Sequence, residues 1–161
     1  MRKIYFLSIF ILLSELFTFS QNIYRGFKFL EKLDYDKAKK VFEDIYQTEN
    51  QNTDANFGLA LVYSDNQSMF YNLTQAWHHC RILKSNLDKI QPDQLEIIGE
   101  YFKNTEKRPS SRPVKKKIDY AIETIESHYI KYIREENNLD LANEVIERFP
   151  DFRYDDNVVH I

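Results

Sequence analysis

Two histidines and a cysteine stand side by side at positions 78–80, and imidazole and thiolate groups are common ligands of zinc. On an α-helix, however, neighbouring side chains point about 100° apart, so His78, His79 and Cys80 cannot reach a single ion. Cys80 continues an apolar stripe and is expected in the core, with both histidines beside the stripe and partly exposed. We therefore predict no metal site and no bound cofactor.

His128 lies at the edge of the apolar face of a long helical segment. Thr124 is one turn away and could share a hydrogen bond with it, whereas no carboxylate has the spacing needed to orient the ring as a base. We favour a hydrogen-bonded packing histidine over a catalytic one. Carboxylate pairs such as Glu123 and Glu126 lie among polar neighbours, where nothing separates their pKa values. With three isolated glycines and no nucleophile motif, the chain is predicted to have no catalytic residues and not to be an enzyme.

A basic segment runs from Lys103 to Lys117, with Glu106 as its one acid. It could form a patch for an acidic partner or for lipid headgroups, or it could be a solvated connector, which we favour. No aromatic residue is interleaved in the loop, and the net charge of the chain is −3, so nucleic acid is not expected as a partner. The candidate basic patch comprises Lys107, Arg108, Arg112, Lys115, Lys116 and Lys117.

Aromatic residues make up 15% of the chain, and most of those after residue 20 fall on apolar stripes, where core packing accounts for them. Aromatic side chains that lie off the stripes are of more interest, because exposed tyrosines often anchor binding surfaces. These residues are Tyr24, Phe29, Phe70, Tyr71 and Tyr120.

The first 20 residues have the layout of a secretory signal peptide. A short basic start is followed by an apolar run from Ile4 to Phe19, and small residues precede an expected cleavage site after Ser20. Glu15 interrupts this run, which makes a permanent membrane span less favourable than cleavage. We expect an exported protein, periplasmic or associated with the cell envelope, with no stable membrane span after cleavage. An uncleaved anchor and a cytosolic protein are the alternatives, in that order.

Apolar residues recur at steps of three and four through most of the remaining chain, which predicts helices. The single cysteine excludes an intramolecular disulfide, and few glycines or prolines are present to form the turns of a β-sandwich. Pro92 is placed to begin a helix, and Asn104 to Pro113 forms a loop. The expected helical segments are Ile23–Leu33, Ala38–Ile45, Leu59–Tyr63, Leu73–Ile90, Pro92–Phe102, Val114–Ile133, Leu139–Phe149 and a last one from about Asp155. We expect the chain to continue past Ile161, although a short terminal helix is also compatible with the pattern.

One sequence pattern recurs along the chain, and each later copy matches it less well. Its best copy has a small residue and an aromatic in one helix, followed by a tyrosine, an alanine and an aromatic in the next. The three copies are Gly26-x-x-Phe29 with Tyr35-x-x-Ala38-x-x-x-Phe42, Leu59-Ala60-x-x-Tyr63 with Leu73-x-x-Ala76-x-x-x-Cys80, and Leu139-x-x-Ala142-x-x-x-Ile146. This sequence pattern resembles the tetratricopeptide repeat. An irregular helical bundle is the alternative.

The resemblance implies an all-α fold of antiparallel helical hairpins, stacked as a short right-handed solenoid over residues 21–161. In that family the first helix of each hairpin lines a concave groove that receives a peptide. The matching positions, our candidate partner groove, are Ile23, Phe27, Leu30, Phe57 and Leu61. The expected signal peptide, followed by such hairpins, is also similar to the N-terminal part of exported envelope repeat proteins of Bacteroidetes-type bacteria.

These observations favour a non-catalytic scaffold of the cell envelope or periplasm that holds a protein or peptide partner. The alternative is a structural spacer or docking domain of a longer multidomain envelope protein. A metal-dependent enzyme using the histidines is the least favoured interpretation.

Overall fold

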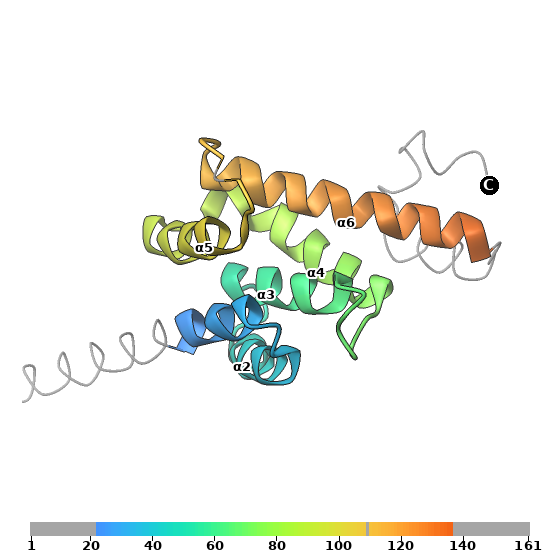
Figure 1. Ribbon diagram of the computed structural model, residues 1–161, viewed down its shortest axis with the longest axis horizontal. Coiled ribbons are helices and arrows are strands. Elements are labelled where there is room, and N and C mark those ends of the chain that lie inside the picture. Colours follow the sequence, from blue (N-terminus) through green and yellow to red (C-terminus); the bar gives the residue numbers. More distant parts are fainter. Residues whose placement is uncertain (1–21, 109, 137–161) are drawn as a thin grey trace, which may run out of the picture.

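The computed structural model describes residues 22–108 and 110–136, and all regular secondary structure within these ranges is helical. The prediction of an all-α fold is confirmed for this part of the chain. The expected signal peptide, the third repeat copy and the last expected helix lie outside it. The described helices are residues 22–31, α2 (Tyr35–Thr48), α3 (Thr53–Ser64), α4 (Leu73–Asn86), the 3₁₀ turn η1 (Leu87–Lys89), α5 (Pro92–Thr105) and α6 (Val114–Glu136) (Figure 1).

Short polar side chains begin three of these helices by accepting backbone hydrogen bonds, which satisfies donors that the first turn leaves free. Asn52 accepts from the backbone N–H of Ala55 at 3.0 Å, and Asn72 accepts from Gln75 at 3.0 Å. Asp34 caps α2 in the same way. Pro92 is the first residue of α5, as the sequence predicts.

The expected polar stretch from Thr48 to Asp54 is only partly a connector. Thr48 belongs to α2, and α3 begins at Thr53, several residues before its apolar positions suggest. Asn52, Thr53 and Asp54 are buried. The cap formed by Asn52 explains why α3 extends back into polar sequence, since it supplies the hydrogen bond that the first turn needs.

Phe42 of α2 is the centre of the packing between the first three helices. Its ring lies against both Gly26 and Gly58 of α3. A Cβ at Gly26 would approach the ring to 2.7 Å, and one at Gly58 would overlap it. Both glycines therefore permit a close approach that no other residue allows. Phe27 stacks edge-on against Phe42 with ring centroids 5.0 Å apart.

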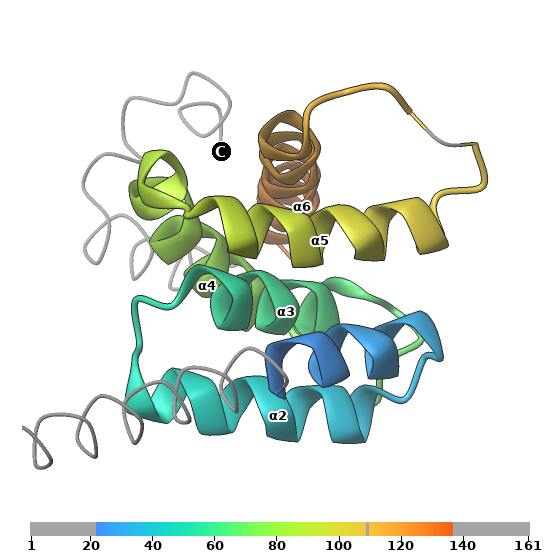
Figure 2. The same cartoon turned by 90° about the vertical axis from the view of Figure 1, so that its left-hand side faces the viewer.

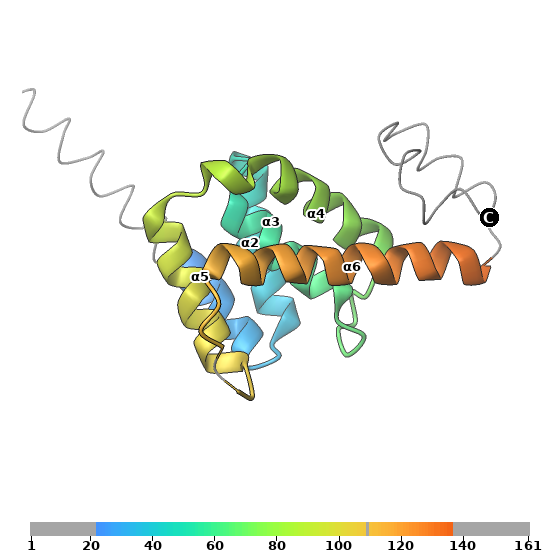
Figure 3. The same cartoon turned by 90° about the horizontal axis from the view of Figure 1, so that it is seen from above.

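α2 packs against α3 and α3 against α4, and α6 packs mainly along α4. Figure 2 shows α5 running roughly parallel to α3 and to the helix of residues 22–31. In Figure 3, α6 begins beside the middle of α5, where Val114 lies close to Gly99, and continues past α4. Trp77 of α4 stacks on Tyr129 of α6 with centroids 5.0 Å apart, and Lys84 pairs with Glu126 at 2.8 Å.

Candidate functional site

Two adjoining cavities lie where α3, α5 and α6 come together. The Tyr35 cavity has a volume of about 470 Å³ and the Tyr120 cavity one of about 580 Å³. Leu61, Ser64 and His128 line both of them, so the two spaces meet over the C-terminal turn of α3. We call them together the joined cavities.

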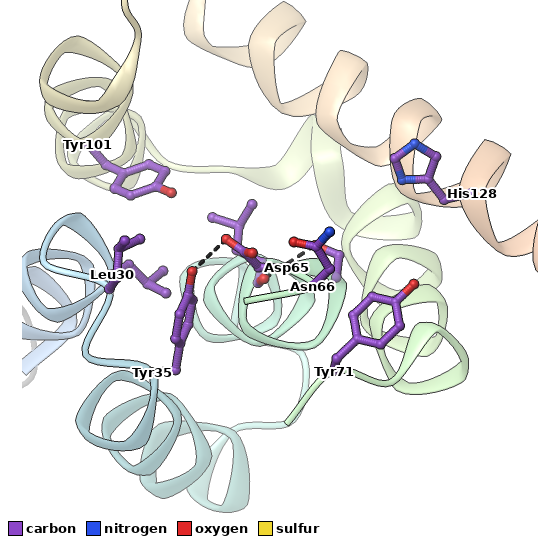
Figure 4. A pocket seen from close by; sticks show the side chains of 10 residues that line it. Leu30, Tyr35, Asp65, Asn66, Tyr71, Tyr101 and His128 are labelled. Carbon is purple, nitrogen blue, oxygen red and sulfur yellow. Dashed lines mark hydrogen bonds between the residues drawn. The ribbon is translucent and has the colours of Figure 1, made fainter. Parts of the chain in front are cut away.

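The Tyr35 cavity is built from the first residue of α2, the loop that follows α3, and the far end of α5 (Figure 4). Tyr35 Oη donates a hydrogen bond of 2.6 Å to Asp65 Oδ2, and Asp65 Oδ1 accepts one of 2.9 Å from the backbone N–H of Gln67. Both carboxylate oxygens are therefore engaged. Burial, and then the bond to Asp65, raise the pKa of Tyr35. The neutral phenol of Tyr35 thus stays hydrogen-bonded to the Asp65 carboxylate, and this pair forms part of the cavity wall.

Figure 4 shows the side chains of Tyr101 and Asn66 turned toward the same space as Tyr35, while His128 stands at its edge on α6. Burial, followed by the charge of Asp65, raises the pKa of Tyr101 to about 12. Its hydroxyl therefore stays protonated at neutral pH. The cavity presents amide and hydroxyl groups that suit hydrogen bonding to a polypeptide.

The Tyr120 cavity combines an apolar floor with a basic rim. The floor comes from Leu61, Phe102, Tyr120, Ala121 and Ile125. The rim carries Arg108, Arg112 and Lys117, together with Glu106. Such a lining is amphipathic, with charge at the edge and apolar surface beneath.

Glu106 folds the basic loop back onto the helices. It accepts a hydrogen bond of 2.9 Å from Lys117 Nζ and one of 3.0 Å from the backbone N–H of Ser110. The bond to Lys117 is the main reason that the pKa of Glu106 is lowered. Lys117 Nζ lies 5.6 Å from the Phe102 ring centroid, and the Arg112 guanidinium lies 5.6 Å from that of Tyr120. These contacts hold the loop beside the cavity.

The six residues of the candidate basic patch divide into two groups. Arg108, Arg112 and Lys117 line the Tyr120 cavity, and the other three, Lys107, Lys115 and Lys116, do not. Lys117 is half-buried against Glu106, whereas Arg108 and Arg112 are exposed. Among the described residues, no ion pair joins a carboxylate to either arginine.

The five residues of the candidate partner groove lie mostly inside the core. Ile23, Phe27, Leu30 and Phe57 are buried, and Leu61 is half-buried. The physical reason is α5, whose aromatic side chains cover this face: Tyr101 lies 5.3 Å from Phe27 and Phe102 lies 5.7 Å from Phe57, measured between ring centroids. Of the five, Leu30 and Leu61 line the joined cavities.

The expectation that His79 is partly exposed is wrong, since its side chain is buried. Its Nδ1 donates to Asn56 Oδ1 at 2.9 Å, and its ring stacks on Tyr63 with centroids 5.8 Å apart. Burial lowers the pKa of His79 to about 4, which keeps it neutral. His78 is half-exposed and Cys80 is buried, as predicted. The three residues thus serve packing in α4.

The expectation that His128 packs beside Thr124 is also wrong. His128 is exposed, and Thr124 Oγ1 instead donates to the backbone carbonyl of Tyr120 at 2.8 Å. A threonine within a helix commonly bonds back to the carbonyl four residues earlier, and this bond uses the only donor of the Thr124 side chain.

Tyr71 and Tyr120, two of the off-stripe aromatics, are 49% and 60% exposed, and each lines one of the joined cavities. Sequence reasoning missed Tyr35, Asp65 and Asn66 as lining residues. The polar break from Ser64 to Ser68 was the available signal, because a loop at the end of a helix is where polar side chains can gather.

Asp54 is a second buried ionisable group, in the first turn of α3 and away from the joined cavities. Gln94 of α5 donates to Asp54 Oδ2 at 2.9 Å, while Oδ1 accepts no hydrogen bond from another described residue. Burial is the main reason that its pKa is raised to about 7. The group ties α5 to α3 through a single hydrogen bond.

Within residues 22–108 and 110–136, no group of three or more histidine, cysteine or acidic side chains is placed to hold a metal ion. No helix in those ranges has the length and apolar character needed to cross a membrane. Comparison with protein-family models, curated proteins and solved structures found no match to the chain. Function must therefore be inferred from the described residues themselves.

Proposed function

We propose that this chain is a non-catalytic protein-interaction module of the cell envelope or periplasm, and that it holds a segment of a partner protein in the joined cavities. The observation that carries the proposal is the meeting of two cavities at Leu61, Ser64 and His128, with the exposed tyrosines Tyr71 and Tyr120 on either side. Their volumes of about 470 and 580 Å³ each lie within the range of ligand pockets.

The chemistry of the lining supports a polypeptide as the occupant. Tyrosine and arginine are enriched at the centres of protein interfaces, because each combines a large apolar surface with a polar end. Tyr71, Tyr120, Arg108 and Arg112 supply these groups around the half-buried Leu61. A main chain needs hydrogen-bonding partners along its length, and Asn66 and the tyrosine hydroxyls offer them.

The finer fold that goes with this proposal is a short tetratricopeptide-like stack of hairpins. The close approach of Gly26, Phe42 and Gly58 supports it, since small residues at helix crossings let neighbouring hairpins pack closely. In this arrangement α5 covers the apolar positions of residues 22–31 and α3. The proposed binding surface is therefore the joined cavities and not the candidate partner groove. The proposal that the protein is exported is based on the signal-peptide layout of residues 1–20.

Affinity capture from envelope extract tests the proposal. The immobilised protein is compared with Tyr71→Ala/Tyr120→Ala, which removes the two exposed rings from the joined cavities. The matched control is Met69→Ala/Tyr132→Ala, because these residues are 83% and 37% exposed and line neither cavity. We expect a discrete protein that wild type and control retain equally and that the cavity variant loses by about tenfold or more.

Retention of the same protein by both double variants would contradict the proposal, as would the absence of any protein specific to wild type. Circular dichroism and thermal unfolding check that all three proteins are folded. Capture that is equally strong from cytosolic extract would argue against the proposed compartment.

A further inference from the structure

We propose that the segment in the Tyr120 cavity is both acidic and apolar: an internal stretch of a partner protein with aspartate or glutamate beside a large apolar side chain. This inference rests on the proposed function and names the chemistry of the partner. Its carboxylates would contact Arg108 and Arg112, and its apolar side chain would cover Leu61 and Ile125.

The charge balance of the rim leaves cationic groups for a partner. Glu106 accepts a hydrogen bond from Lys117 Nζ at 2.9 Å, so these two charges offset each other. The structure pairs neither Arg108 nor Arg112 with a carboxylate within the described residues, and both side chains are exposed. Two guanidinium groups at one rim, each able to bind a carboxylate through two parallel hydrogen bonds, favour acidic side chains as ligands.

The position of Arg112 supports its availability for this contact. Its guanidinium lies 5.6 Å from the centroid of the Tyr120 ring, which orients the group. Its charge helps to lower the pKa of Glu106, but within residues 22–108 and 110–136 no ion pair joins it to a carboxylate. Tyr120 is itself 60% exposed, so its ring can be covered by an incoming side chain. The same residue pair thus offers an apolar surface and a charge.

The floor of the cavity explains the apolar part of the segment. Leu61, Phe102 and Ile125 come from α3, α5 and α6, and their side chains line one space of about 580 Å³. That volume lies within the range of pockets that receive organic ligands. Burying a large side chain against this floor would add the hydrophobic contribution that surface ion pairs do not supply.

The Tyr35 cavity sets the direction of the segment. Asp65 carries the negative charge there, and Asn66 and Tyr71 are its polar neighbours. A second carboxylate beside Asp65 would be repelled, so acidic residues belong at the Arg108 end and neutral or basic residues at the Tyr71 end.

Anionic lipid is the other source of negative charge, and the geometry favours protein. The apolar floor lies within a cavity, where the broad surface of a bilayer cannot follow it. The carboxylate of Asp65 lines the Tyr35 cavity and would oppose an anionic surface that spread over both cavities. The net charge of the whole chain is also −3.

Selection from a random dodecapeptide library displayed on phage tests the inference. The purified protein and three variants are used as bait. Arg108→Glu/Arg112→Glu reverses the rim, and Leu61→Glu blocks the place where the cavities meet. Lys32→Glu/Lys40→Glu is the matched charge control, because both lysines are exposed and lie outside the joined cavities. Vesicles of phosphatidylglycerol are tested in parallel by co-sedimentation.

We expect wild type and the lysine control to select peptides with acidic residues beside phenylalanine, tyrosine, tryptophan or leucine. Synthetic copies of these peptides should bind about tenfold or more weakly to the arginine variant, and more weakly at high salt. Selected peptides that need Leu61 but carry no acidic bias would overturn this inference and leave the proposed function standing. Peptides that bind the Leu61 variant as well as wild type, or binding of vesicles without any selected peptide, would overturn both.

Discussion

Asp54 and His79 are buried ionisable side chains whose effects on stability oppose each other. The pKa of Asp54 is raised from 3.8 to about 7, so its folded form holds a proton that the unfolded form releases, and its contribution to stability falls as pH rises from about 4 to 7. The pKa of His79 is lowered from 6.5 to about 4, so its contribution falls as pH drops through that interval. Between pH 4 and 6.5 the two slopes partly cancel.

Replacing Asp54 by asparagine should separate these two effects. Asparagine keeps an acceptor for Gln94 and carries no charge to bury, so we expect the variant to be more stable than wild type at pH 8 by on the order of 2–4 kcal/mol. Stability of the variant should also rise more steeply than that of wild type between pH 4 and 6.5, because only the contribution of His79 remains there. Urea unfolding at a series of pH values measures both quantities.

Asp44→Asn is the control for this experiment, because Asp44 is an exposed carboxylate of α2. It should leave the pH profile close to that of wild type. An Asp54→Asn protein with the same pH dependence as wild type would show that Asp54 is ionised in the folded state throughout this range.

At the scale of the elements, the contact of Phe42 with two glycines determines how closely the first three helices pack. Alanine favours helices over glycine by about 1 kcal/mol, so an unhindered helical glycine should gain stability on this substitution. At Gly58 the added Cβ would overlap the Phe42 ring, which lies in the core and is itself fully buried. Overpacking therefore opposes the gain in helix propensity.

Gly58→Ala should lower the free energy of unfolding by about 1–3 kcal/mol, the usual cost of inserting a methyl group into a packed core. Gly99→Ala is the matched substitution in α5, where the nearest contact of the new Cβ is Val114 Cγ2 at 3.0 Å, a half-buried side chain at the beginning of α6. Its effect should be smaller than that at Gly58. Equal stability of the two variants, measured by denaturant unfolding, would contradict the role given to Phe42.

The elements were largely predictable from sequence because their signals are local. Pro92, the loop from Asn104 to Pro113 and the three-and-four spacing of apolar residues locate α5 and α6 closely. The beginning of α3 was not predictable, because polar residues such as Thr53 resemble a connector until the cap at Asn52 is considered. The burial of His79 depends on Asn56, which lies 23 residues away and on another helix.

At the scale of the whole molecule, the joined cavities depend on how α5 and α6 are placed, and sequence periodicity does not give this placement. Periodicity identifies the apolar face of each helix but not which helix covers it. The candidate groove residues Phe27 and Phe57 were therefore expected at an open surface, whereas Tyr101 and Phe102 of α5 cover them. Tyr71 and Tyr120 could be singled out because they lie off the apolar stripes, and both line the joined cavities.

Site-specific photocrosslinking in the producing cell tests most directly whether these cavities hold a partner. A benzophenone side chain is introduced at position 120 in one strain and at position 132 in another, since Tyr120 lines the Tyr120 cavity and Tyr132 is exposed on the same helix outside it. We expect irradiation to give a covalent adduct of discrete mass from position 120 and none of that mass from position 132. The same adduct from both positions, or no adduct from position 120, would contradict a partner segment in the joined cavities.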